Sequence, residues 1–155
     1  MSGPTAAPLE VRIVRLPEGR DLPPPERATP SSSGFDLRAR VDGSIELAPG
    51  ARALVPTGVA VALPDGCEAQ VRPRSGLAVE HGLTLLNSPG TVDCDYRGEI
   101  KAVLVNLGQA PVRIRRGDRV AQLVVMQLAD VVIREVTTLP ETERGAGGFG
   151  HTGER

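Results

Sequence analysis

Turn-forming residues interrupt this chain at short intervals, and that spacing restricts its possible folds more than any other feature. Short apolar segments alternate with breaks built around glycine, proline and aspartate. No amphipathic stretch between the breaks is long enough for an independent helix, so the pattern predicts an all-β sandwich or barrel. The breaks fall at Asp42-Gly43, Pro49-Gly50, Pro64-Asp65-Gly66, Pro89-Gly90, Leu107-Gly108 and Arg116-Gly117-Asp118.

The apolar segments predict the positions of the strands. We expect strands at residues 9–14, 35–41, 44–47, 52–55, 59–63, 68–72, 83–86, 100–105, 112–114, 120–126 and 131–136. In the first of these, Leu9, Val11 and Ile13 alternate with other residues, which predicts one buried face. One short helix is expected over residues 76–81, with Ser75 as its N-cap and Gly82 as its left-handed stop.

Two segments of the chain lack this strand pattern. Residues 17–34, rich in proline and serine, predict an ordered loop or a linker. Residues 144–155 have no strand period and carry five glycines, Gly145, Gly147, Gly148, Gly150 and Gly153. We therefore expect one domain over residues 1–140 and a flexible glycine-rich tail over residues 141–155.

Aromatic residues are scarce, and their positions suggest function. The chain has no Trp, and its rings are Phe35, Tyr96 and Phe149. The core must then consist of Val, Leu, Ile and Ala side chains, because a domain of this size usually buries several rings. If two of these three rings occur in polar, glycine-rich motifs, their positions favour roles other than filling the core.

Charge and cysteine content exclude several classes of protein. The net charge is −1, so no overall basic field favours nucleic acid or an anionic membrane as a partner. Residues 1–8 lack the pattern of a signal peptide, and no apolar run approaches the ~20 residues of a membrane-spanning helix. Cys67 and Cys94 are too few for a disulfide framework. We expect a cytoplasmic protein.

Two segments early in the chain are candidates for chemistry. In residues 33–39, Asp36 opens a strand after a long loop, as either a loop cap or a functional carboxylate. In residues 72–78, Arg74 and Ser75 stand where a strand ends and the short helix begins. Free N–H groups there suit phosphate oxygens. The alternative is that Ser75 only caps the helix and Arg74 is solvated.

The third segment, residues 87–99, is the densest in polar groups. Asn87 precedes the Pro89-Gly90 turn and can donate and accept hydrogen bonds at once, which suits the edge of a nucleobase. Asp93 and Asp95 are candidates to orient a water molecule or a metal ion. The alternative is a surface hairpin with ordinary turn residues.

The fourth and fifth segments are residues 116–124 and the tail. Gln122 is a polar residue inside an apolar strand, so it needs a partner, either a neighbouring backbone or a ligand phosphate. Successive N–H groups in the tail can form an anion nest, and Phe149 has no core to enter, so a stacking role is a candidate. The alternative is a disordered end.

In this order, the five segments resemble the five motifs of the trimeric deoxyuridine triphosphatases, the dUTPases. The resemblance runs from about Leu9 to the C-terminus. Its most specific parts are Pro73-Arg74-Ser75-Gly76-Leu77-Ala78, Asp93-Cys94-Asp95-Tyr96-Arg97-Gly98 and Arg144-Gly145-Ala146-Gly147-Gly148-Phe149-Gly150. It implies a distorted jelly-roll subunit, a homotrimer with shared active sites, and Mg²⁺-dependent hydrolysis of dUTP to dUMP and pyrophosphate. That activity would keep uracil out of DNA and supply dUMP for dTMP synthesis.

The resemblance also implies roles for single residues. Asp93 would activate the attacking water, and Tyr96 would pack beneath the deoxyribose and exclude a 2′-hydroxyl. Asp36 would position Mg²⁺ through water, the metal being held mainly by the triphosphate. The base would be read by Asn87, Gly90, Thr91 and Val92, with the backbone near Lys101, and phosphate oxygens would be held by Arg74, Ser75, Gly76 and Gln122.

Each site would be shared by three subunits: one would supply the base-binding hairpin, another the phosphate contacts of the second motif, and the tail would close over the substrate from a third. Arg144 would reach the γ-phosphate and Phe149 would stack on uracil. Gly150, His151 and Thr152 would close on the terminal phosphate. His151 departs from the family, which usually has a serine there, so the role of that hydroxyl does not transfer directly.

Two alternative functions fit the same scaffold. A dCTP deaminase shares the fold and trimer but has a glutamate on the strand after the base-binding hairpin, near Val103 of this chain. Valine cannot move a proton, which disfavours deamination. A non-catalytic nucleotide-binding module is the second alternative, and an intact Asp93 argues against it.

Overall fold

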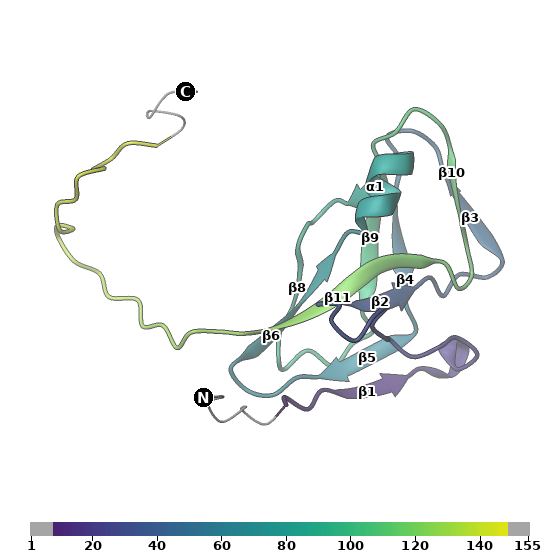
Figure 1. Ribbon diagram of the computed structural model, residues 1–155, viewed down its shortest axis with the longest axis horizontal. Coiled ribbons are helices and arrows are strands. Elements are labelled where there is room, and N and C mark those ends of the chain that lie inside the picture. Colours follow the sequence, from purple (N-terminus) through teal and green to yellow (C-terminus); the bar gives the residue numbers. More distant parts are fainter. Residues whose placement is uncertain (1–7, 149–155) are drawn as a thin grey trace.

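The computed structural model describes residues 8–148. This part of the chain contains eleven β-strands, one α-helix and one turn of 3-10 helix. Every strand pairing in this part of the chain is antiparallel. The strands wrap around one core, as Figure 1 shows, in the distorted jelly-roll arrangement that the sequence predicts.

The strands form two larger sheets and two pairs. The four-stranded sheet has the order β2-β11-β6-β8, and the three-stranded sheet has the order β4-β9-β7. The bounds are β2 Phe35–Arg38, β11 Arg119–Gln127, β6 Cys67–Arg72, β8 Gly90–Val92, β4 Arg52–Pro56, β9 Lys101–Asn106 and β7 Leu83–Leu85. The pairs are β1 (Arg12–Arg15) with β5 (Val59–Ala62) and β3 (Ser44–Leu47) with β10 (Val112–Arg115).

Strand β6 shows why these short segments form strands. Cys67, Ala69 and Val71 are buried, and the side chains between them are half-buried. This alternation places one face of the strand on the core and leaves the other for polar groups. Strand β6 then carries the chain directly to the predicted phosphate-binding residues at its end.

The core is aliphatic, as the composition predicts. Its largest nearly fully buried apolar side chains are Leu37, Val55, Leu83, Ile100, Leu104 and Ile114. Phe35 is only half-buried and packs against this core from outside. The guanidinium carbon of Arg27 lies 4.8 Å from the centroid of the Phe35 ring, so the ring is half covered by a cation.

Helix α1 (Ser75–His81) follows β6, one residue earlier than predicted. The N-cap is Arg74, in extended conformation, and Ser75 is the first helical residue. Gly82 ends the helix in the left-handed region at φ 67°, as expected. A side chain on Gly82 would collide with the backbone of Gly108, so this position needs glycine. Within residues 8–148, no helix is long and apolar enough to cross a membrane.

Two predictions about strands are wrong. Strand β1 has no buried face, because no second layer covers it, and all four of its residues are exposed. Residues 131–136 form no strand, because they pair with no strand in the described part of the chain. The chain leaves the body after β11, and residues 128–148 run away from it (Figure 1).

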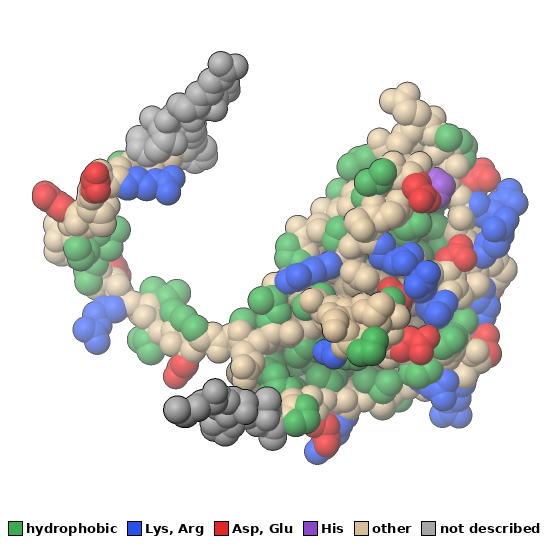
Figure 2. Space-filling model, in the orientation of Figure 1, with side chains coloured by type: hydrophobic (Ala, Val, Ile, Leu, Met, Phe, Trp, Pro, Cys, Tyr) green, Lys and Arg blue, Asp and Glu red, His purple; other side chains and the backbone are tan. Residues whose placement is uncertain are grey.

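Charged side chains of both signs are mixed over the body. In Figure 2, basic and acidic groups alternate on the viewed face, in keeping with the net charge of −1. The extended residues 128–148 carry several exposed apolar side chains, Val131, Val132, Ile133 and Leu139 among them.

Candidate active site

A cavity of about 360 Å³ opens beside β8, at the densest of the five motifs. Leu54 of β4 and Val71 of β6 form its apolar walls. Six residues predicted to bind substrate also line it: Asn87, Gly90, Thr91, Val92, Tyr96 and Lys101. The structure therefore brings the predicted nucleoside-binding residues to one place.

The segment that carries these residues is not a simple hairpin, contrary to the prediction. Strand β8 pairs with β6, whereas β9 pairs with β4 and β7. Residues 93–100 therefore connect two sheets, and the cavity lies where the sheets meet. We call these residues the 93–100 connection.

Gly90 lets Asn87 lie against the start of β8. A Cβ atom on Gly90 would lie 3.3 Å from Nδ2 of Asn87 and 3.4 Å from Cβ of Val71. Gly90 is opposite Val71 in the register of β8 and β6. A side chain at position 90 would therefore crowd Asn87, which lines the cavity.

Asp93 follows β8 directly and points outward. Val92 before it is buried and Asp93 is exposed, as the alternation of a strand requires. The N–H of Tyr96 donates to the carbonyl of Asp93 at 3.1 Å and closes a turn. Within residues 8–148 the Asp93 carboxylate makes no hydrogen bond or ion pair, so both oxygens can accept from a water molecule.

Tyr96 stands at the rim of the cavity with 45% of its surface exposed. Its hydroxyl donates to the backbone carbonyl of Glu99 at 3.0 Å. Gly98 lies directly against the ring, where an added Cβ atom would overlap the hydroxyl and Cζ. One side of the ring is thus fixed by its own chain, and the other is open to a ligand.

The predicted phosphate-binding residues gather around Asp36, which is 5% exposed. Arg119 Nη1 donates to Asp36 Oδ2 at 3.1 Å, and Arg74 Nε lies 3.6 Å from Asp36 Oδ1. Arg74 Nη1 also donates to the carbonyl of Arg119 at 3.1 Å. Two guanidinium groups beside one carboxylate leave a net positive charge, which favours an anion.

The sheet register extends this group. Gln122 of β11 lies opposite Asp36 on β2 and opposite Arg72 on β6. Gln122 is half-buried, and Gly34 lies so close that an added Cβ would be 3.0 Å from Cβ of Gln122. The polar Gln122 thus belongs to a row of polar residues across three strands, where the sequence showed only an interruption of an apolar strand.

Ser75 and Gly76 form the exposed start of α1, directly after Arg74. Backbone N–H groups in the first turn of a helix have no partner within the helix, so they are available to phosphate oxygens. Within one subunit, Arg74 lies beside Asp36, and Ser75 and Gly76 follow it in the chain.

Arg144, which lies in the described part of the tail, is not brought to either group. Arg144 Nε donates to the carbonyl of Gly147 at 2.8 Å, within the tail itself. Phe149, Gly150, His151 and Thr152 lie outside the described residues.

A metal site made of protein side chains alone is absent from the described residues. No group of three or more His, Cys, Asp or Glu side chains in residues 8–148 is placed to hold a metal ion. Asp36 Oδ1 is buried and has no hydrogen-bond partner, although it is an acceptor. Its nearest cation is Arg74 Nε at 3.6 Å, which also makes no hydrogen bond. One such oxygen can accept from a metal-bound water, and alone it is not a complete metal site.

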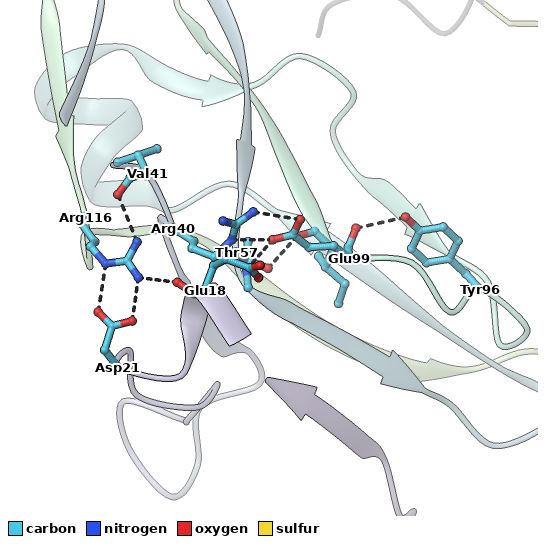
Figure 3. Close-up of polar contacts among 10 residues, drawn as sticks. Glu18, Asp21, Arg40, Val41, Thr57, Tyr96, Glu99 and Arg116 are labelled. Carbon is cyan, nitrogen blue, oxygen red and sulfur yellow. Dashed lines mark hydrogen bonds and ion pairs between the residues drawn. The ribbon is translucent and has the colours of Figure 1, made fainter. Parts of the chain in front are cut away.

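Sequence reasoning missed three charged residues of these groups. Arg119 precedes Gln122 by three residues on the same strand, and its proximity to Gln122 was the available signal. Glu99 and Arg40 form an ion pair behind the cavity (Figure 3), with Arg40 Nε donating to Glu99 Oε1 at 3.0 Å. They are 59 residues apart, so no local pattern could have paired them.

Comparison with known proteins gives one family. The family model for dUTPases matches residues 20–153. The deoxyuridine 5′-triphosphate nucleotidohydrolase of Neorickettsia sennetsu is 54% identical over 142 residues, which cover 92% of this chain and 95% of that protein. The enzyme of the same name from Caulobacter vibrioides is 54% identical over 149 residues, covering 95% and 96%.

Solved structures show the same fold. The dUTPase of Staphylococcus bacteriophage 80alpha with dUPNHPP superposes with a TM-score of 0.83 at 23% identity, over 93% of this chain and 98% of that one. The dUTPase from phage phi11 of S. aureus gives a TM-score of 0.75 at 20% identity, over 86% and 99%.

Proposed function

The chain belongs to the dUTPase family and is a dUTP diphosphatase, hydrolysing dUTP to dUMP and pyrophosphate, and we propose that Asp93 activates the water that attacks the α-phosphorus. The observation that carries this proposal is the position of Asp93. Its carboxylate is exposed and has no partner in the described residues, and Asp93 directly follows Val92, which lines the cavity of the nucleoside-binding motif. A carboxylate in that position can take a proton from water as the water attacks.

The cavity beside β8 takes the deoxyuridine in this proposal. Asn87 and the backbone of residues 90–92 read the edge of uracil, helped by the backbone near Lys101. Tyr96 packs beneath the deoxyribose. The shared lining of one cavity by these residues supports the assignment.

The phosphates extend to the positive group around Asp36 of a second subunit in this proposal. Arg74, Ser75, Gly76 and Gln122 hold phosphate oxygens, and Arg119 keeps Asp36 and Arg74 in place. Support comes from the contacts of Asp36 with Arg119 and Arg74 and from the register of Gln122 with Asp36. Phosphoryl transfer asks the protein mainly for positioning and charge neutralisation, which arginine and helix N–H groups supply.

Mg²⁺ completes the proposed site. Asp36 Oδ1 would contact it through a water molecule, and the triphosphate would supply most of its ligands. When bound, the ion neutralises charge on the phosphate oxygens as the bond to the leaving pyrophosphate breaks. One phage dUTPase is described with a structural Mg(II) ion, which supports a role for this cation in the family.

We also propose a homotrimer in which the tail closes a neighbour's site. Residues 128–148 are exposed and run away from their own subunit, which supports a role on another copy (Figure 1). Arg144 would meet the γ-phosphate, Phe149 would stack on uracil, and Gly150, His151 and Thr152 would cover the terminal phosphate. Cys67 and Cys94 are free thiols, which supports the cytoplasm as the proposed location.

Deamination of dCTP is not favoured. The position where deaminases of this fold carry a proton-transferring glutamate falls near Val103, a half-buried residue of β9. Its side chain cannot donate or accept a proton. In cells, hydrolysis of dUTP would lower the amount of dUTP, and thereby of uracil in DNA, while supplying dUMP.

The position of attack can be tested with water that carries a heavy oxygen isotope. Attack at the α-phosphorus puts the label into dUMP and leaves pyrophosphate unlabelled, because the new bond forms between the water oxygen and that phosphorus. Mass spectrometry of dUMP and pyrophosphate shows which product carries the label. Label in pyrophosphate would exclude the proposed placement of Asp93 and its water.

A further inference from the structure

Glu99 joins the 93–100 connection to two other parts of the chain. Its Oε1 accepts from Arg40 Nε at 3.0 Å and from the N–H of Gly58 at 2.8 Å. Its Oε2 accepts from Arg40 Nη2 at 3.3 Å. Figure 3 shows this ion pair next to Tyr96. One carboxylate thus links the connection to the chain after β2 and to the β4–β5 turn.

The partners of Glu99 are themselves fixed. Gly58 has φ 72°, and an added Cβ would lie 3.0 Å from both Arg40 Cδ and Gly19 Cα, so only glycine fits. The N–H of Arg40 donates to the carbonyl of Pro56 at 2.8 Å. Thr57 Oγ1 donates to the carbonyl of Ile100 at 2.6 Å, which fixes the residue after Glu99. The link is therefore rigid at both ends.

The link is also shielded from water. The side chain of Glu99 is 11% exposed and that of Arg40 is 21% exposed. Burial pushes the pKa of the Glu99 carboxyl upward, but hydrogen bonds from Arg40 and from Gly58 N–H outweigh burial, so this pKa lies below its ordinary value. Glu99 is therefore ionised at neutral pH. Removing its charge would leave Arg40 poorly compensated in a confined place.

The position of the Tyr96 ring depends on Glu99. Its hydroxyl donates to the backbone carbonyl of Glu99, and both residues line the cavity. Gly98, between them in sequence, packs directly against the ring. A displacement of Glu99 must therefore move the ring that forms the rim of the cavity.

We propose that Glu99 is a positioning residue that, through Tyr96, sets the preference of the enzyme for dUTP over UTP. The inference rests on the proposed place of Tyr96 beneath the deoxyribose. A ring fixed against the sugar leaves no room for a 2′-hydroxyl, whereas a ring free to shift by a fraction of an ångström admits it. Glu99 thus affects which sugar the enzyme accepts and takes no part in the chemical step.

The test compares kcat/KM for dUTP with kcat/KM for UTP in Glu99→Gln. The amide keeps the size of the side chain and removes its charge. We expect the ratio of the two values to fall about tenfold, because UTP gains relative to dUTP. A purely structural role would lower the active fraction equally for both substrates and leave the ratio unchanged.

Asp21→Asn is the matched control. Asp21 forms the other two-bond pair in Figure 3, with Arg116 Nε at 3.0 Å and Arg116 Nη2 at 2.6 Å, and neither residue lines the cavity. This variant should keep the wild-type ratio. If Glu99→Gln does not fold, Arg40→Lys decides, because it keeps a positive charge and loses the two-bond geometry. It should shift the ratio in the same direction.

Tyr96→Ala distinguishes a failure of the proposed role of Tyr96 from a failure of the inference about Glu99. If this variant keeps the wild-type ratio, the proposed role of Tyr96 fails, and the inference about Glu99 fails with it. If Tyr96→Ala lowers the ratio while Glu99→Gln and Arg40→Lys keep it, the inference about Glu99 alone is overturned. A fall in the ratio for Tyr96→Ala and for Glu99→Gln supports both.

Discussion

Replacing Asp93 with asparagine is expected to lower kcat by about a hundredfold or more, because general-base catalysis contributes that much. The amide keeps the hydrogen-bonding shape of the side chain but cannot take a proton from water. Binding should persist, since the walls of the cavity and the arginines around Asp36 are unchanged. The measurements are steady-state release of pyrophosphate and titration with a non-hydrolysable dUTP analogue.

Asp95→Asn is the matched control for this variant. Asp95 is also exposed and lies two positions further along the same connection. The proposed mechanism gives Asp95 no role, so its loss should change kcat by no more than about twofold. Equal losses in both variants, or near-normal turnover by Asp93→Asn, would contradict the assignment of Asp93.

Truncating the chain after Glu143 is expected to lower kcat/KM by about a hundredfold or more, because preorganised phosphate donors have effects of this size. The truncation removes Arg144, the glycines and Phe149. Thermal stability should barely change, since residues 144–148 add nothing to the buried core. Circular dichroism melting and light scattering on one preparation test the fold and the oligomer, and pyrophosphate release tests activity.

Arg144→Ala in the full-length chain shows how much of the lost activity depends on this one side chain. It removes one charged donor and keeps the glycine backbone, so its activity should lie between those of the wild type and the truncated chain. Loss of the oligomer together with activity in the truncated chain would show that the tail is structural.

The fold could be predicted where local pattern and tertiary environment agree. Strand β6 alternates buried and half-buried residues because one of its faces lies on the core, and its sequence carries that period. Strand β1 carries an alternation of its own and still buries no face, although β5, its only partner, does. A period of two shows that a face is apolar, and it does not show that another layer covers this face.

The site could be predicted to the extent that its members are close in sequence. Residues 87–101 supply most of the cavity lining, so one motif identified them. The contact between Arg119 and Asp36 spans 83 positions, and the one between Arg40 and Glu99 spans 59. These pairs depend on the order β2-β11-β6-β8 and on the β4–β5 turn, which no short pattern encodes.

The shared site is the central claim, and mixing two inactive variants tests it most directly. Asp93→Asn keeps the tail, and the chain truncated after Glu143 keeps Asp93. If Asp93 and the tail of each site come from different subunits, randomly mixed trimers at equal amounts should recover about a quarter of wild-type activity, because each site needs one chain of each kind. Activity no higher than the sum of the two separate variants would show that both groups come from one chain and would contradict the account.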